Sequence, residues 1–255
     1  MICSTNNESK YIQNMKTSIN NIYFISGTMC DERIWTDVWK QLSPLIPADI
    51  NFIHLVIPSL NTIDEITYDL SEKIAENSCI VGFSLGGYFA SNIALMFPNK
   101  IQKLLLVSNM SSALPDKENK ERLRTIQWIN THGYSGVPDK RINNLLSPYA
   151  HNNQHIKSII QAMDKSLGKE VLVHQLKVTT QRKNLLPQLM ALECPIQFCV
   201  GDTDCLVKLD RIQQHIAQST TKNKILQVLE NTGHMLPLEQ PERLAHTIYT
   251  YFFEK

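Results

Sequence analysis

Short runs of apolar residues alternate along the chain with segments whose apolar residues recur at helical spacing. The run Leu104–Val107 has no polar interruption, which is typical of a parallel strand buried on both faces. Such alternation predicts a doubly wound, mostly parallel α/β sheet. The expected strands are 22–26, 52–57, 78–83, 101–108, 195–201 and 225–229, and the main expected helices are 32–42, 63–75, 86–97 and 241–253. Asn61 and Thr62 are alternative N-caps for the second of these helices.

The alternation stops between residues 114 and 187, where no strand-like run occurs and charged and amide side chains are frequent. This stretch predicts a helical cap inserted into an α/β core formed by 21–113 and 188–255. Its expected helices are 116–129, 140–146, 155–166 and 169–182. Residues 1–20 are polar and lack the apolar stretch of a signal peptide, so we expect a disordered leader.

Composition narrows the class of protein. With 255 residues, 43% hydrophobic content and a net charge of +1, the chain suits one large globular domain and gives no electrostatic reason to bind nucleic acid or an anionic membrane surface. No apolar run approaches the roughly 20 residues needed to span a bilayer. The six cysteines form no C-x-x-C pair, which indicates reduced thiols and a cytoplasmic location. A monomer and a homodimer are both compatible with these features.

The most informative motif is Gly82-Phe83-Ser84-Leu85-Gly86, directly between an expected strand and an expected helix. A Gly-x-Ser-x-Gly sequence in that context is typical of a nucleophile elbow, a sharp turn that exposes a reactive serine. The alternative is a plain Gly-Ser turn, because the pentapeptide alone is a common pattern.

Two later segments contain the groups that a reactive serine requires. A serine hydroxyl needs a base to accept its proton, and the base needs a partner that fixes its tautomer. Asp202 and Asp204 follow one late strand, and His234 follows the next. The carboxyl ends of parallel strands meet at one edge of a sheet, so these groups can converge there with Ser84. The chain order Ser, Asp, His is one of the known orders of a catalytic triad.

Four segments together resemble the α/β-hydrolase fold superfamily, in particular its small, cap-bearing serine esterases. They are Ser26–Asp31, Gly82–Gly87, Gly201–Asp204 and Gly233–Glu242. The resemblance extends from about residue 22 to the end of the chain. It implies that Ser84 is the nucleophile, His234 the general base and Asp204 the residue that orients the histidine. In the family's Gly-x-x-Asp pattern the acid is the fourth residue, which selects Asp204 over Asp202.

The resemblance also implies an oxyanion hole made of two backbone N–H groups, those of Leu85 and Thr28. The family commonly has His-Gly in the second loop, whereas this chain has Ser26-Gly27. A backbone N–H can donate whichever side chain stands at position 26, but the Met29 N–H is an alternative to the Thr28 N–H as the second donor. The chemistry requires no metal and no organic cofactor.

Other residues whose side chains could bind substrate or react have simpler interpretations. Met29, Trp128, Tyr134 and Met235 are candidate substrate-binding residues, although Trp128 and Tyr134 are equally suited to packing. Cys30 and Cys205 adjoin the expected site loops, but such cysteines more often serve as small packing residues. His54 lies within a strand and is expected to be a hydrogen-bonded core histidine.

These features predict a serine hydrolase that cleaves a carboxylic ester or thioester of a small or medium acyl group through an acyl-enzyme. The expected partner is a small-molecule acyl substrate. Serine at the elbow disfavours the haloalkane dehalogenase and epoxide hydrolase branches, which use aspartate. The alternatives are other triad chemistry, such as a carbon–carbon bond hydrolase, a lyase or an acyl-carrier-protein methyl esterase. A non-catalytic scaffold that senses a ligand or binds a partner is a further alternative.

Overall fold

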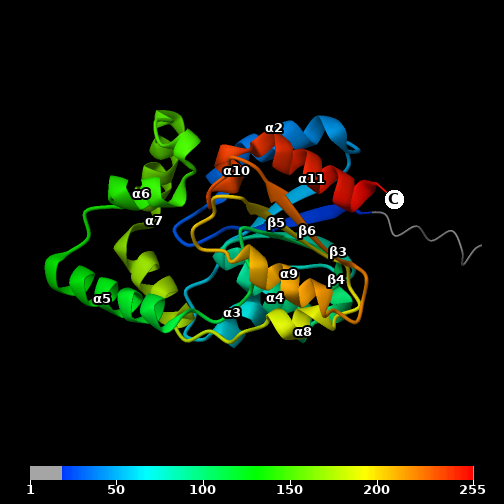
Figure 1. Cartoon of the computed structure of the whole chain (residues 1–255), viewed down its shortest axis with the longest axis horizontal. Helices are drawn as coiled ribbons and strands as arrows, with labels where there is room; N and C mark the ends of the chain where they lie inside the picture. Colours follow the sequence, from blue (N-terminus) through cyan, green and yellow to red (C-terminus); the bar gives the residue numbers. More distant parts are fainter. Residues whose placement is uncertain (1–18, 255) are drawn as a thin grey trace, which may run out of the picture.

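The computed structural model describes residues 19–254 of the chain (Figure 1). Apart from its last two residues, the leader expected at 1–20 lies outside the described part.

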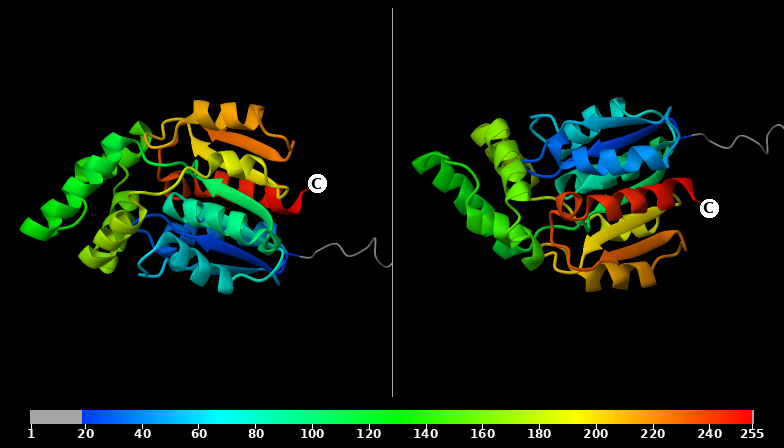
Figure 2. Two further views of the ribbon diagram at one scale, coloured as in Figure 1. Left: turned by 90° about the horizontal axis from the view of Figure 1, so that it is seen from below. Right: turned by 90° about the horizontal axis from the view of Figure 1, so that it is seen from above.

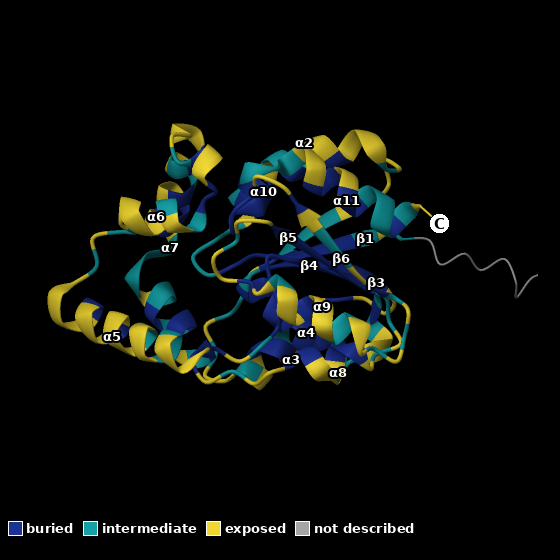
Figure 3. Cartoon of the chain, in the orientation of Figure 1, coloured by how far each residue is buried: buried dark blue, intermediate teal, exposed yellow. Residues whose placement is uncertain are grey.

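A six-stranded, entirely parallel sheet forms the centre of the protein, in the order β2-β1-β3-β4-β5-β6. The predicted α/β sheet is therefore confirmed. The strands are β1 Asn21–Ile25, β2 Asn51–Leu55, β3 Ser78–Phe83, β4 Ile101–Val107, β5 Ile196–Gly201 and β6 Lys224–Leu229. All residues of β3 and β5 are buried, because both strands lie inside the sheet and are covered on both faces (Figure 3).

Helices cover both faces of the sheet (Figures 1 and 2). On one face lie α2 (Thr36–Leu42) and α11 (Pro241–Phe253), and the core there includes Trp35 and Leu244. The opposite face is covered by α3 (Ile63–Glu72), α4 (Leu85–Met96), α8 (Leu186–Met190) and α9 (Leu209–Ala217). Shorter elements are α10 (Leu236–Glu239) and the 3-10 turns η1 (Glu32–Ile34), η2 (Ser43–Leu45), η3 (Pro98–Lys100) and η4 (Pro148–Ala150).

Local sequence explains where two of these helices begin. Thr62 is the N-cap of α3: its hydroxyl accepts from the Glu65 N–H at 3.1 Å, and the Glu65 carboxylate accepts in return from the Thr62 N–H at 3.0 Å. Thr62 rather than Asn61 therefore fills the predicted cap position. At α11, Pro241 occupies the first turn, where its missing N–H costs no hydrogen bond.

Between β4 and β5 the chain forms a helical insertion made of α5 (Asp116–His132), α6 (Asp139–Leu145) and α7 (Gln154–Thr179). Gly168, with φ of 73°, breaks α7 into two helical stretches. That positive φ favours glycine, and the break falls between the expected helices 155–166 and 169–182. The sequence analysis missed α8 and α9, which are short, with five and nine residues.

The insertion lies at the end of the sheet where the strands have their carboxyl termini (Figure 2). Hydrogen bonds connect it to the loops after β1, β2 and β6. Gln175 Oε1 accepts from the Met29 N–H at 3.0 Å after β1, and His174 Nε2 lies 2.6 Å from the Leu60 carbonyl oxygen after β2. The Leu145 carbonyl accepts from the backbone N–H of residue 234 at 2.7 Å, after β6. Among residues 19–254, no helix combines the length and the apolar content needed to cross a bilayer.

Candidate active site

Ser84 lies on the turn between β3 and α4, with φ of 49° and ψ of −115°. This strained conformation is the strand–turn–helix geometry that the Gly-x-Ser-x-Gly motif requires. The turn has no space for side chains at its two glycines. A Cβ at Gly86 would lie 2.1 Å from the Ile25 carbonyl oxygen, and one at Gly82 would lie 2.7 Å from the Gly87 Cα. The elbow is therefore held by close backbone packing.

The structure brings Ser84, His234 and Asp204 into one hydrogen-bonded chain. Nε2 of His234 lies 2.9 Å from Ser84 Oγ, and its Nδ1 lies 3.0 and 2.9 Å from the two carboxylate oxygens of Asp204. Because both oxygens accept, the ring proton belongs on Nδ1, and the Nε2 lone pair faces the serine. This is the arrangement in which a histidine can take the serine proton.

Asp204 is held as an oriented, ionised acceptor. Its Oδ1 accepts from the Leu206 N–H at 2.8 Å and the Val207 N–H at 3.2 Å, and its side chain is fully buried. Burial acts to raise the pKa of Asp204, but the charge and hydrogen bond of His234 and the two backbone donors outweigh it, so the pKa lies below its ordinary value. The carboxylate therefore stays charged where it faces the imidazole.

Asp202, the alternative acid, has a different position. Its side chain lies at the surface, and Oδ1 accepts from the backbone N–H of Thr232 at 3.0 Å. It connects the loops after β5 and β6 and makes no hydrogen bond to His234 within the described residues. Its carboxylate therefore stabilises the contact between these two loops.

The carboxylate of Glu239, to which the sequence analysis assigned no role, supports the loop before His234. Glu239, in α10, accepts through Oε2 from the Gly233 N–H at 3.1 Å and from the Ser147 N–H of the insertion at 2.8 Å. Glu239 belongs to the segment that carried the family resemblance, but nothing in the motif showed what its side chain contacts. It connects the loop before His234 to the insertion.

The two expected oxyanion donors lie beside Ser84. Thr28, Leu85, Ser84 and His234 line one narrow cleft. Within residues 19–254 neither the Thr28 N–H nor the Leu85 N–H has a hydrogen-bond acceptor. By contrast, the Met29 N–H donates to Gln175 Oε1 at 3.0 Å, so it is already engaged in the insertion contact.

Ser26, which stands where the family commonly has histidine, holds this loop in place. Its hydroxyl donates to the Asp31 carbonyl at 3.1 Å and accepts from Trp35 Nε1 at 2.9 Å, while His54 Nε2 lies 2.8 Å away. Since the hydroxyl proton is committed to Asp31, Nε2 of His54 acts as the donor. His54 is thus a hydrogen-bonded histidine, as expected.

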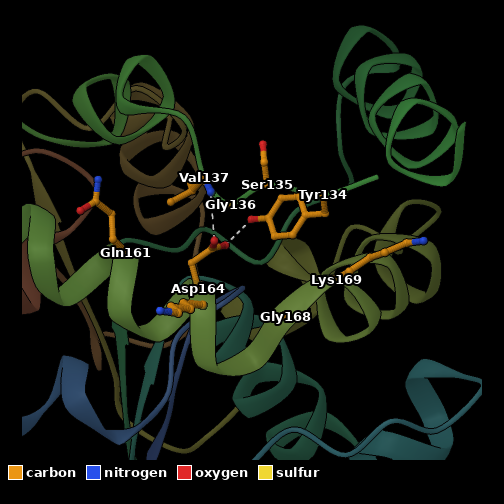
Figure 4. Close-up of a pocket in the computed structure, with 9 residues that line it drawn as sticks. Tyr134, Ser135, Gly136, Val137, Gln161, Asp164, Gly168 and Lys169 are labelled. Carbon is orange, nitrogen blue, oxygen red and sulfur yellow. Dashed lines mark hydrogen bonds between the residues drawn. The ribbon is translucent and has the colours of Figure 1, made fainter. Parts of the chain in front are cut away.

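None of the four candidate substrate-binding residues lines this cleft. Trp128 is 63% exposed and stacks on His132, and Met235 is buried in the core. Tyr134 lines a separate cavity of about 510 Å³ within the insertion, where it and the Val137 N–H donate to the buried Asp164 carboxylate (Figure 4). Helical spacing did not reveal which face of the insertion points at the serine.

The cysteines near the site do not have the character of nucleophiles. Burial raises the pKa of Cys30 to about 12, and its Sγ donates to the Thr28 carbonyl at 3.4 Å. Burial also raises the pKa of Cys205, whose Sγ donates to the Asn144 carbonyl at 3.0 Å. Both thiols remain protonated near neutral pH. Cys30 is partly buried, as the expected packing role requires, whereas Cys205 is exposed.

The insertion contributes charged side chains to the cleft that the sequence analysis did not predict. Arg122 and Glu118 come from α5, and Arg182 follows the end of α7. The cleft has a volume of about 50 Å³. Arg122 and Glu118 are four residues apart on α5.

Fold and site together define an α/β-hydrolase enzyme. Residues 60–241 match the model of the serine aminopeptidase S33 family, and the chain belongs to that family. A pimeloyl-[acyl-carrier protein] methyl ester esterase from Pseudoalteromonas atlantica is 21% identical over 84% of this chain and 87% of its own length. A second protein of that name, from Wigglesworthia glossinidia brevipalpis, is 26% identical over 54% of this chain and 57% of its own.

Solved structures share the fold at low sequence identity. A thermophilic esterase from Thermogutta terrifontis superimposes with a TM-score of 0.77 and 19% identity, covering 92% of this chain and 89% of its own. An enol-lactonase from Burkholderia xenovorans gives a TM-score of 0.73 and 14% identity, covering 92% and 91%. These similarities concern the fold.

Proposed function

We propose that the protein is a serine hydrolase that cleaves a carboxylic ester or thioester through an acyl-enzyme. The hydrogen-bonded chain from Ser84 through His234 to Asp204 carries this proposal. It supplies a nucleophile, a base with its lone pair facing that nucleophile, and a buried carboxylate that stabilises the imidazolium formed in the reaction.

The chemistry follows from this geometry. Ser84 Oγ attacks the substrate carbonyl carbon while its proton moves to Nε2 of His234. The negative charge that develops on the carbonyl oxygen is stabilised by the N–H groups of Leu85 and Thr28, and the first turn of α4 adds its positive dipole end. The acyl C–O or C–S bond then breaks, and the leaving alcohol or thiol takes the proton from Nε2. Water, activated by the same histidine, attacks the acyl-enzyme and releases the acid.

We assign the helical insertion the role of a cap over this cleft. It supplies Glu118, Arg122 and Arg182 to the same cleft as Ser84. A wall of this kind limits the access of water and selects substrates by shape and charge. The substrate is a small acyl compound, and the protein acts as a cytoplasmic monomer or homodimer without nucleic-acid or membrane partners.

The charges in the cleft favour ester cleavage over the aminopeptidase activity in the family's name. An aminopeptidase must accommodate the α-ammonium group of a peptide close to its nucleophile. Here the cleft contains two guanidinium groups, and its Glu118 carboxylate is already paired with Arg122 at 2.9 Å. A substrate ammonium would therefore meet repulsion that no free carboxylate offsets.

A second candidate is the hydrolysis of a methyl ester on an acyl chain carried by an acyl carrier protein. Both curated relatives bear that activity in their names, at 21% and 26% identity. The same triad would serve, because the reaction is again the cleavage of a carboxylic ester.

A substrate panel tests the proposal. It contains methyl esters and thioesters of short acyl groups, an acyl-carrier-protein methyl ester and an aminoacyl p-nitroanilide, each with wild type and Ser84→Ala. We expect wild type to cleave the short esters or thioesters and Ser84→Ala to lose that activity. Cleavage confined to the acyl-carrier-protein ester would favour the second candidate. Cleavage of the anilide alone, or retained activity in Ser84→Ala, would overturn the ester proposal.

A further inference from the structure

The cleft beside Ser84 carries an imbalance of charge that the triad does not use. Its insertion wall presents Arg122 and Arg182 but only one carboxylate, that of Glu118. The remaining ionisable groups of the cleft region are His234 and its partner Asp204. They are hydrogen-bonded to each other, and Asp204 also accepts from two neighbouring backbone N–H groups. The cationic excess therefore belongs to the two arginines.

Arg122 has protein partners that account for its charge. Its Nη2 and Nε donate to Glu118 Oε1 at 2.9 and 3.2 Å, one helical turn away, and its Nη1 donates to the Thr179 hydroxyl at 3.2 Å. The pair with Glu118 and the bond to α7 hold this side chain in a fixed place on the cleft wall.

Arg182 has no such compensation. Its Nε donates to the Ser112 carbonyl at 2.9 Å, and its guanidinium carbon lies 5.0 Å from the centre of the Tyr88 ring. No carboxylate forms an ion pair with it in the part of the chain that the structure describes. Burial, and then the charge of Arg122, lower the pKa of Arg182 to about 10. The fold thus holds a guanidinium where its charge is disfavoured.

We infer that Arg182, with Arg122 beside it, binds an anionic group of the substrate, so that the preferred substrate is a short ester carrying a carboxylate a few bonds from the scissile carbonyl. This rests on the proposed ester hydrolysis by Ser84. A guanidinium presents a planar row of donors that matches a carboxylate, and the Nε bond to Ser112 leaves the terminal nitrogens for that contact. Because both arginines and Ser84 line one cleft of about 50 Å³, the anion and the ester must be close together.

The reaction balances as ordinary ester hydrolysis. The acyl C–O bond breaks, water supplies the hydroxyl group of the new acid, and the alcohol leaves with a proton. The product carries two carboxylates. The arginines take no part in bond making, so they are specificity-determining residues and not members of the triad.

A pair of isosteric esters tests the inference. Monomethyl glutarate carries a free carboxylate, and methyl glutaramate replaces that carboxylate by a neutral amide of the same shape. We expect kcat/KM of wild type to favour the carboxylate ester by at least about tenfold, the value of one charged hydrogen-bonding contact. Arg182→Met should lose most of that preference, chiefly through a lower kcat/KM for the carboxylate ester, and circular dichroism shows whether the variant is folded.

Arg124→Met is the matched control, since Arg124 lies on α5 near Arg122 but is exposed and outside the cleft. It should keep the wild-type preference. Glutarate should also inhibit wild type competitively and Arg182→Met much less. Equal kcat/KM for the two esters in wild type, or an unchanged ratio in Arg182→Met, would overturn this inference while the ester proposal stands. If wild type cleaves no ester of any kind, the proposed function fails and the inference fails with it.

Discussion

Replacing Asp204 by Asn changes one atom at the buried end of the triad, and the structure indicates which proton moves as a result. Oδ1 of Asp204 accepts from two backbone N–H groups, those of Leu206 and Val207. An asparagine must keep its carbonyl oxygen there, so its NH2 group takes the place of Oδ2, which lies 2.9 Å from Nδ1 of His234. Nδ1 then has to accept a hydrogen bond rather than donate one.

This change at Nδ1 also changes the group that faces Ser84. With Nδ1 as an acceptor, the neutral imidazole carries its proton on Nε2, which faces Ser84 Oγ at 2.9 Å. The base then has no lone pair available for the serine proton. A tautomer reversal of this kind costs about 10⁴-fold in kcat, or about 5 kcal/mol at 1.36 kcal/mol per factor of ten. The overall geometry should change little, because asparagine and aspartate have the same shape.

The assay is kcat/KM for the best ester of the substrate panel, with circular dichroism to show that each variant is folded. Asp202→Asn is the matched control: Asp202 is exposed and accepts from the Thr232 N–H, which an asparagine oxygen can also accept. It should change the activation free energy by less than about 0.5 kcal/mol. If Asp204→Asn stays within tenfold of wild type while Asp202→Asn loses its activity, the reasoning about the acid is refuted.

Two further predictions concern the histidine loop and acid pH. Glu239→Gln removes the charge from an oxygen that accepts from the Gly233 and Ser147 N–H groups, so it should lower the free energy of unfolding by about 1–2 kcal/mol and lower kcat more than it changes KM. Glu242→Gln, at an exposed position of α11, is the control, and equal effects of the two substitutions would contradict the role of Glu239. Because the folded-state pKa of Asp204 lies below the unfolded value of about 3.9, its charge stabilises the fold above that pH, and this contribution disappears as the pH falls through the folded pKa. Urea unfolding of wild type and Asp204→Asn should therefore give stabilities that converge below about pH 4, and a pH-independent difference would contradict the prediction.

The sheet and the convergence of Ser84, Asp204 and His234 could be predicted from the sequence because each depends on a local signal. The continuous apolar run of β4 indicated a strand buried on both faces, and Gly82 and Gly86 around Ser84 indicated a turn without room for side chains. His234 follows the last strand directly, and the topology of a parallel sheet then places it at the same edge as Ser84.

The walls of the cleft could not be predicted in the same way, since they depend on how the insertion packs over the sheet. Trp128 and Tyr134 were candidate substrate-binding residues by residue type, but they lie outside the cleft. Arg122 and Arg182 lie inside it, and the sequence analysis did not single them out. Their roles arise from tertiary packing across residues far apart in the chain, for which helical spacing contains no signal.

The central claim is that Ser84 is the activated nucleophile, and covalent labelling tests it most directly. The intact protein is treated with a fluorophosphonate, which reacts with activated serines, and the modified peptide is identified by mass spectrometry. We predict one phosphonyl group per chain, on Ser84, with labelling lost in Ser84→Ala and strongly slowed in Asp204→Asn. An unlabelled wild-type protein, or a label on another residue that persists in Ser84→Ala, would contradict the claim.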